Sequence, residues 1–247
     1  MFDGLLLIDK EKGWTSHDVV AKIRGALRHE LKARSQSTDN AQQTTPAKRR
    51  VKVGHTGTLD PAATGLLVLV VGSYCKRAQE FSKLDKTYEV TMKLGYTSTT
   101  GDSEGVISKK QNVKSKKPTE QDLRRVCADF MGEIKQTPPA YSAVKVNGQR
   151  AYALARAGKE VNLEPRKVTI YQLSITNYAY PEVRFTCRVS SGTYIRSLVE
   201  DIGEKHGTGA YMTDLRRLRV GSFDLKDAYT VDQLQNKPIR EILKATV

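Results

Sequence analysis

Cysteine, histidine and tryptophan are scarce in this chain of 247 residues, which contains three, four and one of them. Cys75, Cys127 and Cys187 lie far apart and form no CxxC pair, which argues against a disulfide framework and against a zinc site. The histidines are also scattered, with no HxxxH spacing. The sequence therefore gives no indication of a metal site, and we expect a protein of a reducing cytoplasm.

Long hydrophobic runs and phosphate-binding glycine motifs are also absent. The apolar run near the N-terminus, Leu5–Ile8, is too short for a signal peptide or a membrane span. No basic amphipathic helix with an aromatic face stands out, so we expect no membrane partner. The motifs GxxxxGK[ST] and GxGxxG do not occur, which excludes the common nucleotide-binding loops.

Positive charge is abundant. The chain has 41 Lys and Arg against 27 Asp and Glu, a net charge of +14, and its 38% hydrophobic content is ordinary for a globular protein. Such a charge attracts polyanions, of which nucleic acid is the usual one. A basic surface that is merely solvated is the alternative.

Two periodicities predict an α+β domain with a largely antiparallel sheet and helices packed against it. The predicted strands are residues 4–10, 65–72, 86–95, 182–194 and, as a short one, 215–221. Two longer helices are predicted at residues 15–31, capped by Thr15 or Ser16, and at residues 119–132. A short helix closed by Gly158 follows an Asn147-Gly148 turn. A further helix carries Ile195, Leu198, Val199 and Ile202 at helical spacing, and a last helix ends the chain.

The remaining segments read as loops. Residues 32–52 are polar, low in complexity and basic at both ends, and we predict a flexible basic loop there. Residues 96–105 form a polar loop, and residues 109–117 form a solvated basic stretch. With no internal repeat and no linker long enough to separate two cores, we expect residues 1–247 to form a single domain.

One loop stands out, "GHTGTLDPAATGLL" at residues 54–67. Asp60 precedes a proline, which favours extended backbone angles, and the glycines on either side let neighbouring chain approach closely. Rigid scaffolds often present functional residues from such loops, here between a basic segment and the most apolar strand. The alternative is an Asx-turn, in which the aspartate only caps its own loop.

Three further residues break local expectations. Arg196 falls in the first turn of its helix, where the helix dipole disfavours a cation; it is solvent-facing or compensated by an anion, either an aspartate or a phosphate. Tyr88 lies on the apolar face of its strand, as a core residue or as a surface that stacks on a nucleobase. His55 is a turn residue or a functional one, with no nucleophile motif beside it.

Five motifs occur together in the order found in one family: GLLLIDKEKGWTS, GHTGTLDPAATGLL, KTYEV, PPAYSAVKVNG and GTYIRSLVEDIG followed by LRRLRVG. In these motifs, from Gly4 to about Gly221, the chain resembles the bacterial-type tRNA pseudouridine-55 synthase family. The resemblance implies the pseudouridine synthase fold, with a mixed, largely antiparallel sheet flanked by helices. It also implies isomerisation of uridine to pseudouridine in the T-loop of tRNA, without metal or cofactor.

The resemblance carries over to single residues. Asp60 is similar to the catalytic aspartate of the family, Tyr88 to the tyrosine that stacks on the target uracil, and Arg196 to the arginine that pairs with the catalytic carboxylate. Positions that contact the flipped-out nucleotide or line its pocket match His55, Tyr194 and Leu215. The aspartate either attacks C1′ or removes the 2′ proton, and the sequence leaves both open. The implied partner is the T-arm stem-loop of tRNA. Because no exposed apolar patch can be read from the sequence, we expect a monomer without an obligatory protein partner.

The chain departs from the family pattern in two places. Family members commonly continue into a small C-terminal RNA-binding domain of the PUA type, and we expect none here. The segment from Lys32 to Lys52 is also longer than usual. We hypothesise that its Lys48, Arg49, Arg50 and Lys52 recover part of the lost RNA affinity.

Two other functions stay open. One is a tRNA-binding or tRNA-folding factor with little dependence on catalysis, and the other is an enzyme that uses Asp60 on a different nucleotide or RNA.

Overall fold

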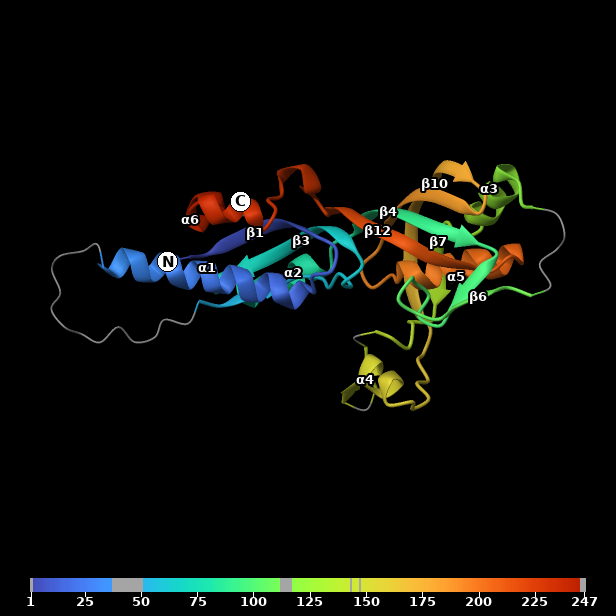
Figure 1. The fold of residues 1–247 in the computed structure, drawn as a ribbon, viewed down its shortest axis with the longest axis horizontal. Coiled ribbons are helices and arrows are strands. Elements are labelled where there is room, and N and C mark those ends of the chain that lie inside the picture. The colour runs from blue at the N-terminus through green and yellow to red at the C-terminus, as the bar shows by residue number, and fades with distance from the viewer. Residues whose placement is uncertain (1, 37–50, 112–116, 143, 147, 245–247) are drawn as a thin grey trace. The chain divides into compact units, whose positions relative to one another are not determined.

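The computed structural model describes residues 2–36, 51–111, 117–142, 144–146 and 148–244, the side chains of residues 34–36, 235 and 236 excepted. The chain forms two compact units, one from residues up to Leu84 together with those from Arg217 onward, and one from Asp85 to Arg216. Figure 1 labels the elements of both. The flexible loop predicted at residues 32–52 falls mostly outside the described residues, including Lys48, Arg49 and Arg50.

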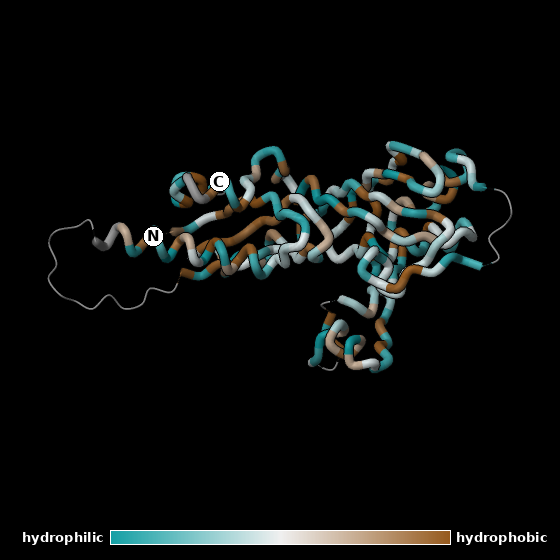
Figure 2. Tube along the Cα trace, viewed as in Figure 1, coloured by the Kyte–Doolittle hydropathy of each residue, from teal (hydrophilic) through white to brown (hydrophobic). Residues whose placement is uncertain are grey.

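The first unit is built on a buried antiparallel pair of strands that are far apart in the sequence. Strands β1 (Gly4–Lys10) and β3 (Thr64–Val71) run antiparallel from Gly4 opposite Val71 to Lys10 opposite Gly65, and β2 (Val53–His55) pairs with the last part of β3. The remaining elements are α1 (Ser16–Gln36), η1 (Gly72–Arg77), α2 (Ala78–Ser82), β13 (Phe223–Asp224), η2 (Leu225–Asp227), η3 (Asp232–Asn236) and α6 (Ile239–Ile242). Figure 2 shows hydrophobic residues along β3, as expected of a strand buried on both faces.

The core of this unit combines residues that are far apart in the sequence. Its central cluster consists of Leu5, Leu7, Leu66, Val68, Val70, Phe81 and Val220. Helix α1 is held to the sheet by Arg24, whose guanidinium donates a hydrogen bond to the carbonyl of Val53 at 3.2 Å. The helix that follows β1 is thereby tied to the strand that leads into the loop around Asp60.

Local sequence explains both ends of α1. Thr15 and Asp18 form a reciprocal cap, in which the backbone N–H of each donates to the side chain of the other at 2.9 and 3.0 Å. Because residues 32–36 contain neither glycine nor proline, nothing stops the helix at its predicted end, and it continues to Gln36.

In the second unit, strands β4, β11, β10 and β7 pair antiparallel in this order, and helices pack on them. Its elements are β4 (Lys86–Leu94), β5 (Tyr96–Ser98), β6 (Ile107–Lys109), α3 (Glu120–Ala128), β7 (Gly132–Gln136), β8 (Lys145–Val146), β9 (Gln149–Arg150), α4 (Ala151–Arg156), β10 (Arg166–Ala179), β11 (Glu182–Val189) and α5 (Ile195–His206). Strand β12 (Ala210–Val220) begins in this unit and ends in the first. The predicted α+β class with a mostly antiparallel sheet is confirmed.

Several boundaries differ from the sequence predictions. Strand β10 was not expected because two register shifts, between Ile170 and Gln172 and between Ile175 and Asn177, interrupt its alternation. Part of the predicted polar loop at residues 96–105 is strand β5, paired with β6. Strand β12 starts at Ala210, before the predicted position. Among the described residues, none of the helices is long and apolar enough to cross a membrane.

Candidate active site

The loop at residues 54–67 leaves β2 and returns into β3, and backbone contacts close it at its base. His55 lies opposite Leu69, and the next residue, Thr56, is buried. Both the N–H and the hydroxyl of Thr56 donate to the carbonyl of Val68, at 3.1 and 3.2 Å. The two ends of the loop are therefore held together before the chain reaches Asp60.

The residues beside Asp60 are held by the start of α1. The Ser16 hydroxyl donates to the carbonyl of Leu59 at 3.0 Å and accepts from its N–H at 2.8 Å. Ser16 and Leu59 are both buried. After the aspartate, the N–H of Ala63 donates to the Asp60 carbonyl at 3.0 Å and closes a turn. The half-buried Asp60 thus sits on a backbone fixed on both sides.

Arg217 anchors the same loop from the other end of the sequence. Its side chain is buried, with 2% of the residue exposed. Its guanidinium donates to the carbonyls of Leu66 at 2.7 Å and Gly57 at 3.0 Å, and reaches that of Thr58 at 3.5 Å. At Gly65, where φ is +98°, a Cβ would lie 2.3 Å from the Arg217 carbonyl oxygen, so only glycine permits this approach.

Lys10 is a second buried cation that contacts the loop, through the carbonyl of Pro61. Its ammonium group donates to the carbonyls of Trp14 at 2.7 Å, Glu11 at 3.0 Å and Pro61 at 3.4 Å. Burial lowers the pKa of Lys10 to about 8, while the carboxylate of Asp60 acts in the opposite direction. Two positively charged side chains, Lys10 and Arg217, therefore bind carbonyls of the loop that carries the Asp60 carboxylate.

His55 lies in strand β2 and is half-buried. Burial lowers its pKa, and the nearby charges of His17 and Arg217 add to the effect. A neutral imidazole is therefore favoured at this position at neutral pH. Its Nδ1 atom is buried, and no described residue forms a hydrogen bond with it.

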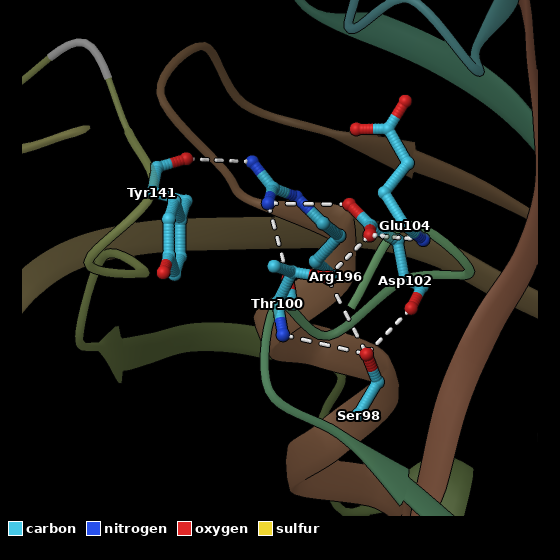
Figure 3. Close-up of polar contacts among 6 residues, drawn as sticks. All are labelled: Ser98, Thr100, Asp102, Glu104, Tyr141 and Arg196. Atoms are coloured by element: carbon cyan, nitrogen blue, oxygen red, sulfur yellow. Dashed lines mark hydrogen bonds and ion pairs between the residues drawn. The ribbon is translucent and has the colours of Figure 1, made fainter. Parts of the chain in front are cut away.

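In the second unit, Arg196 is buried rather than solvent-facing, with 8% of the residue exposed. Its guanidinium donates to the carbonyls of Thr100 at 3.1 Å and Tyr141 at 2.9 Å, and lies 3.3 Å from the carboxylate of Asp102 (Figure 3). Of the two anions expected to compensate this arginine, an aspartate is present.

Asp102 is itself held by its own loop. Its carboxylate accepts from the Thr100 hydroxyl at 2.5 Å and from the Glu104 N–H at 3.0 Å, and Ser98 donates to its carbonyl at 2.5 Å (Figure 3). Because the carboxylate has partners besides Arg196, the ion pair is oriented from both sides. This arrangement fixes the direction of the guanidinium at the start of α5.

The other predicted residues of the second unit lie in its interior or at the start of helix α5. Tyr194 is the N-cap residue of α5, and the buried Gln136 bonds both its N–H, at 2.8 Å, and its carbonyl, at 3.0 Å. Tyr88 on β4 and Leu215 on β12 are each 8% exposed. Asp60 and His55 belong to the first unit, and Tyr88, Tyr194, Arg196 and Leu215 belong to the second.

Sequence reasoning missed Lys10, Arg217 and Asp102. A signal existed for the first two, since Lys10 ends an apolar strand and Arg217 lies two residues from Leu215 on the inward side of β12. Asp102 lies in a segment that read as a polar loop, where an aspartate is unremarkable. Within the described residues, no group of three or more His, Cys, Asp or Glu side chains is placed to hold a metal ion.

Comparison with known proteins identifies the family. Residues 43–195 match the N-terminal domain of the TruB family pseudouridylate synthases, and residues 196–245 match the tRNA pseudouridylate synthase B C-terminal domain. The chain belongs to the TruB family of pseudouridylate synthases. The family inferred from the motifs is thereby confirmed.

Curated relatives of this TruB family member cover almost all of it. It is 38% identical to tRNA pseudouridine synthase B of Opitutus terrae over 99% of the chain and 92% of the relative. It is 44% identical to tRNA pseudouridine synthase B of Burkholderia pseudomallei over 94% of the chain and 69% of the relative.

Two solved structures of similar fold are complexes, one of them with a bound substrate RNA. One, titled a Cbf5-Nop10-Gar1 complex, matches 98% of this chain with a TM-score of 0.67 and 27% identity. Another, titled an H/ACA RNP bound to a substrate RNA containing 2'-deoxyuridine, matches 97% with a TM-score of 0.63 and 25% identity. This chain spans 60% and 57% of the lengths of those two proteins.

We predict that Arg217→Lys slows the reaction of the bound substrate without weakening substrate binding. Arg217 reaches the carbonyls of Leu66, Thr58 and Gly57 from three different nitrogens of its planar guanidinium. A lysine carries all its donors on one nitrogen and does not reproduce this spread, so the loop around Asp60 loses its fixed position. The single-turnover rate should fall by about tenfold to a hundredfold. The matched control is Arg219→Lys on the same strand, because Arg219 is exposed and lies 3.4 Å from the carboxylate of Asp224 on the surface. An Arg217→Lys protein with the full rate would contradict the anchoring role.

We also predict a pH dependence of stability from Lys10. Because its folded pKa of about 8 lies below the unfolded value of 10.5, the unfolded chain binds more protons between these values. The contribution of Lys10 to stability is therefore fully present above pH 10.5 and is lost as the pH falls through 8. The difference in free energy of unfolding between the wild type and Lys10→Met should rise between pH 8 and 10.5, by on the order of 1 kcal/mol per pH unit. A flat difference in urea denaturation across this range would contradict the assignment.

Proposed function

We propose that this chain converts uridine to pseudouridine at position 55 in the T-loop of tRNA, with Asp60 as the catalytic carboxylate. The observation that carries the proposal is the loop around Asp60, fixed by Ser16, Arg217 and Lys10, in a member of the TruB family. Two of its curated relatives bear the name tRNA pseudouridine synthase B. The proposed enzyme acts as a monomer on the T-arm stem-loop.

The proposed reaction rearranges bonds without net gain or loss of atoms. The bond between N1 of uracil and C1′ of the ribose breaks, the base turns, and a bond between C5 and C1′ forms. The proton on C5 is lost, and N1 gains one. A carboxylate at the sugar serves this reaction by attacking C1′ or by removing the 2′ proton, and the proposal includes both routes.

The other predicted residues fit roles around an extruded nucleotide. A base inside a folded tRNA loop must leave its stack, which costs a few kcal/mol. We assign the ring of Tyr88 to stacking on the uracil, and Tyr194, Leu215 and the neutral His55 to contacts with the flipped nucleotide. Arg196 is assigned to orienting the catalytic carboxylate. Its own orientation by Asp102 and by two backbone carbonyls supports a positioning role.

The net charge of +14 supports the choice of RNA as substrate. Lysine and arginine residues that neutralise phosphates release counterions, and this supplies much of the affinity of a protein for nucleic acid. We attribute most of the affinity for the tRNA backbone to this term, and the choice of uridine to the residues assigned to the nucleotide.

The experiment that tests this proposal compares the wild type with Asp60→Asn on a transcribed tRNA under single-turnover conditions. The amide keeps the shape of the side chain and removes its charge. We expect the rate of pseudouridine formation to fall at least about 1000-fold, as is usual when a catalytic nucleophile or base is removed, with tRNA binding retained.

The matched control is Asp129→Asn, because Asp129 is an exposed aspartate that pairs with Lys205 on the surface. It should modify tRNA at the wild-type rate. If wild type and Asp60→Asn both bind tRNA and neither modifies it, the protein is a tRNA-binding factor or acts on another uridine. If Asp60→Asn keeps the wild-type rate, Asp60 is not the catalyst.

A further inference from the structure

The first unit contains a second feature that the proposed reaction does not use. A cavity of about 630 Å³ is lined by Lys226, Asp227, Ala228, Tyr229, Gln233, Lys237 and Lys244. None of these residues belongs to the loop at residues 54–67 or holds it in place. The lining comes entirely from the C-terminal part of the chain, between η2 and the residues after α6.

Two walls of this cavity are fixed to strand β1. The N–H of Tyr229 donates to the carbonyl of Leu7 at 3.0 Å, and the Tyr229 carbonyl accepts from the N–H of Asp9 at 2.9 Å. Further along the strand, Leu5 and Lys244 exchange two backbone hydrogen bonds of 2.8 Å. The cavity therefore has a backbone frame on the buried strand β1.

The charge in this cavity is positive. Three lysines line it and one aspartate opposes them, so the formal balance is +2. Among the described residues, one ion pair involves the lining: Lys244 lies 3.6 Å from Asp227, and both side chains are almost half exposed. A single exposed pair of this kind contributes little. The excess positive charge favours an anion as the ligand of this cavity.

The aromatic residue in the cavity favours a phosphate over a base as the ligand. The ammonium group of Lys237 lies 5.1 Å from the centre of the Tyr229 ring and covers one of its faces. The side-chain oxygen of Gln233 is engaged, since it accepts from the N–H of Thr230 at 2.9 Å, and its NH2 group is left as a donor. This amide donor and the lysine ammoniums, which bind phosphate as point charges, suit the oxygens of a phosphate.

We propose that this basic cavity binds a phosphodiester segment of the RNA substrate and serves as an anchor independent of sequence. The inference rests on the proposed function to the extent that the ligand is RNA. Contacts to phosphate position a nucleic acid on a protein without reading its bases. The cavity then contributes affinity and its salt dependence, and leaves the rate of the bound substrate unchanged.

The test is the triple variant Lys226→Gln, Lys237→Gln and Lys244→Gln, with binding to a transcribed tRNA measured between 50 and 200 mM KCl. Over this range the Debye length falls about twofold, from roughly 14 Å to roughly 7 Å, and contacts to phosphate appear as a fall in affinity with salt. We expect the affinity at the lower salt concentration to fall about tenfold. The slope of log affinity against log salt should become shallower by about one to two, since each lost phosphate contact removes roughly 0.9. The single-turnover rate at saturating protein should stay within about twofold of the wild type.

The matched control is Lys22→Gln, Lys76→Gln and Lys83→Gln, three exposed lysines of the same unit that do not line the cavity. If this control loses as much affinity and slope as the cavity variant, only total charge matters and the proposal is wrong. It is also wrong if the cavity variant binds like the wild type. Thermal unfolding of both variants confirms that they fold.

The binding measurement separates this inference from the proposed function. If the wild type fails to form pseudouridine but the cavity variant alone loses affinity for tRNA, the catalytic proposal fails and the cavity proposal stands. If the wild type modifies tRNA and the cavity variant binds normally, the opposite holds.

Discussion

The guanidinium of Arg217 is the contact on which the geometry of the loop around Asp60 depends. It binds carbonyls on both sides of the aspartate, at Gly57 before it and at Leu66 after it. A buried guanidinium is stable only when its donors are satisfied, and a carbonyl that turns away from it leaves a charge without a partner. The loop around Asp60 and strand β12, which carries Arg217, therefore hold each other in position. Gly65 is the position that lets the two backbones come close enough.

The same principle recurs at the other charged groups. Lys10 binds three carbonyls from below the loop, and Ser16 binds both backbone groups of Leu59. In the second unit, Arg196 binds two carbonyls and Asp102. Each of these side chains is buried and each is held by several partners, so its position does not depend on a single weak bond. Preorganised charge of this kind is what a reaction at a sugar carbon requires, because nothing has to reorient when the reaction occurs.

The sequence predicted what depends on neighbouring residues. The start of α1 follows from the reciprocal bonds of Thr15 and Asp18, and β1, β3, β4 and β11 follow from their apolar patterns. It missed β10, because two register shifts break the alternation of that strand, and it missed the end of α1, because no residue there stops a helix.

The site was predictable to the extent that motifs mark it. The loop around Asp60 stands out because its glycines and proline are unusual together. Arg217, Lys10 and Asp102 do not stand out, because their partners are reached only after folding. The carbonyls that Arg217 binds lie about 150 to 160 positions away in the chain. The family was identified from the motifs, and the roles of Asp60, Tyr88 and Arg196 within it stay predictions.

The central claim is that the loop around Asp60 is held rigidly before substrate binds. Hydrogen exchange at its backbone amides in the free protein tests this most directly. The N–H groups of Thr56 and Leu59 are bonded to Val68 and Ser16, so they should exchange as slowly as those of strand β3, through opening of the whole unit. If they exchange as fast as the amides of the exposed strand β6, the loop opens on its own in the free protein, and its carboxylate is not preorganised.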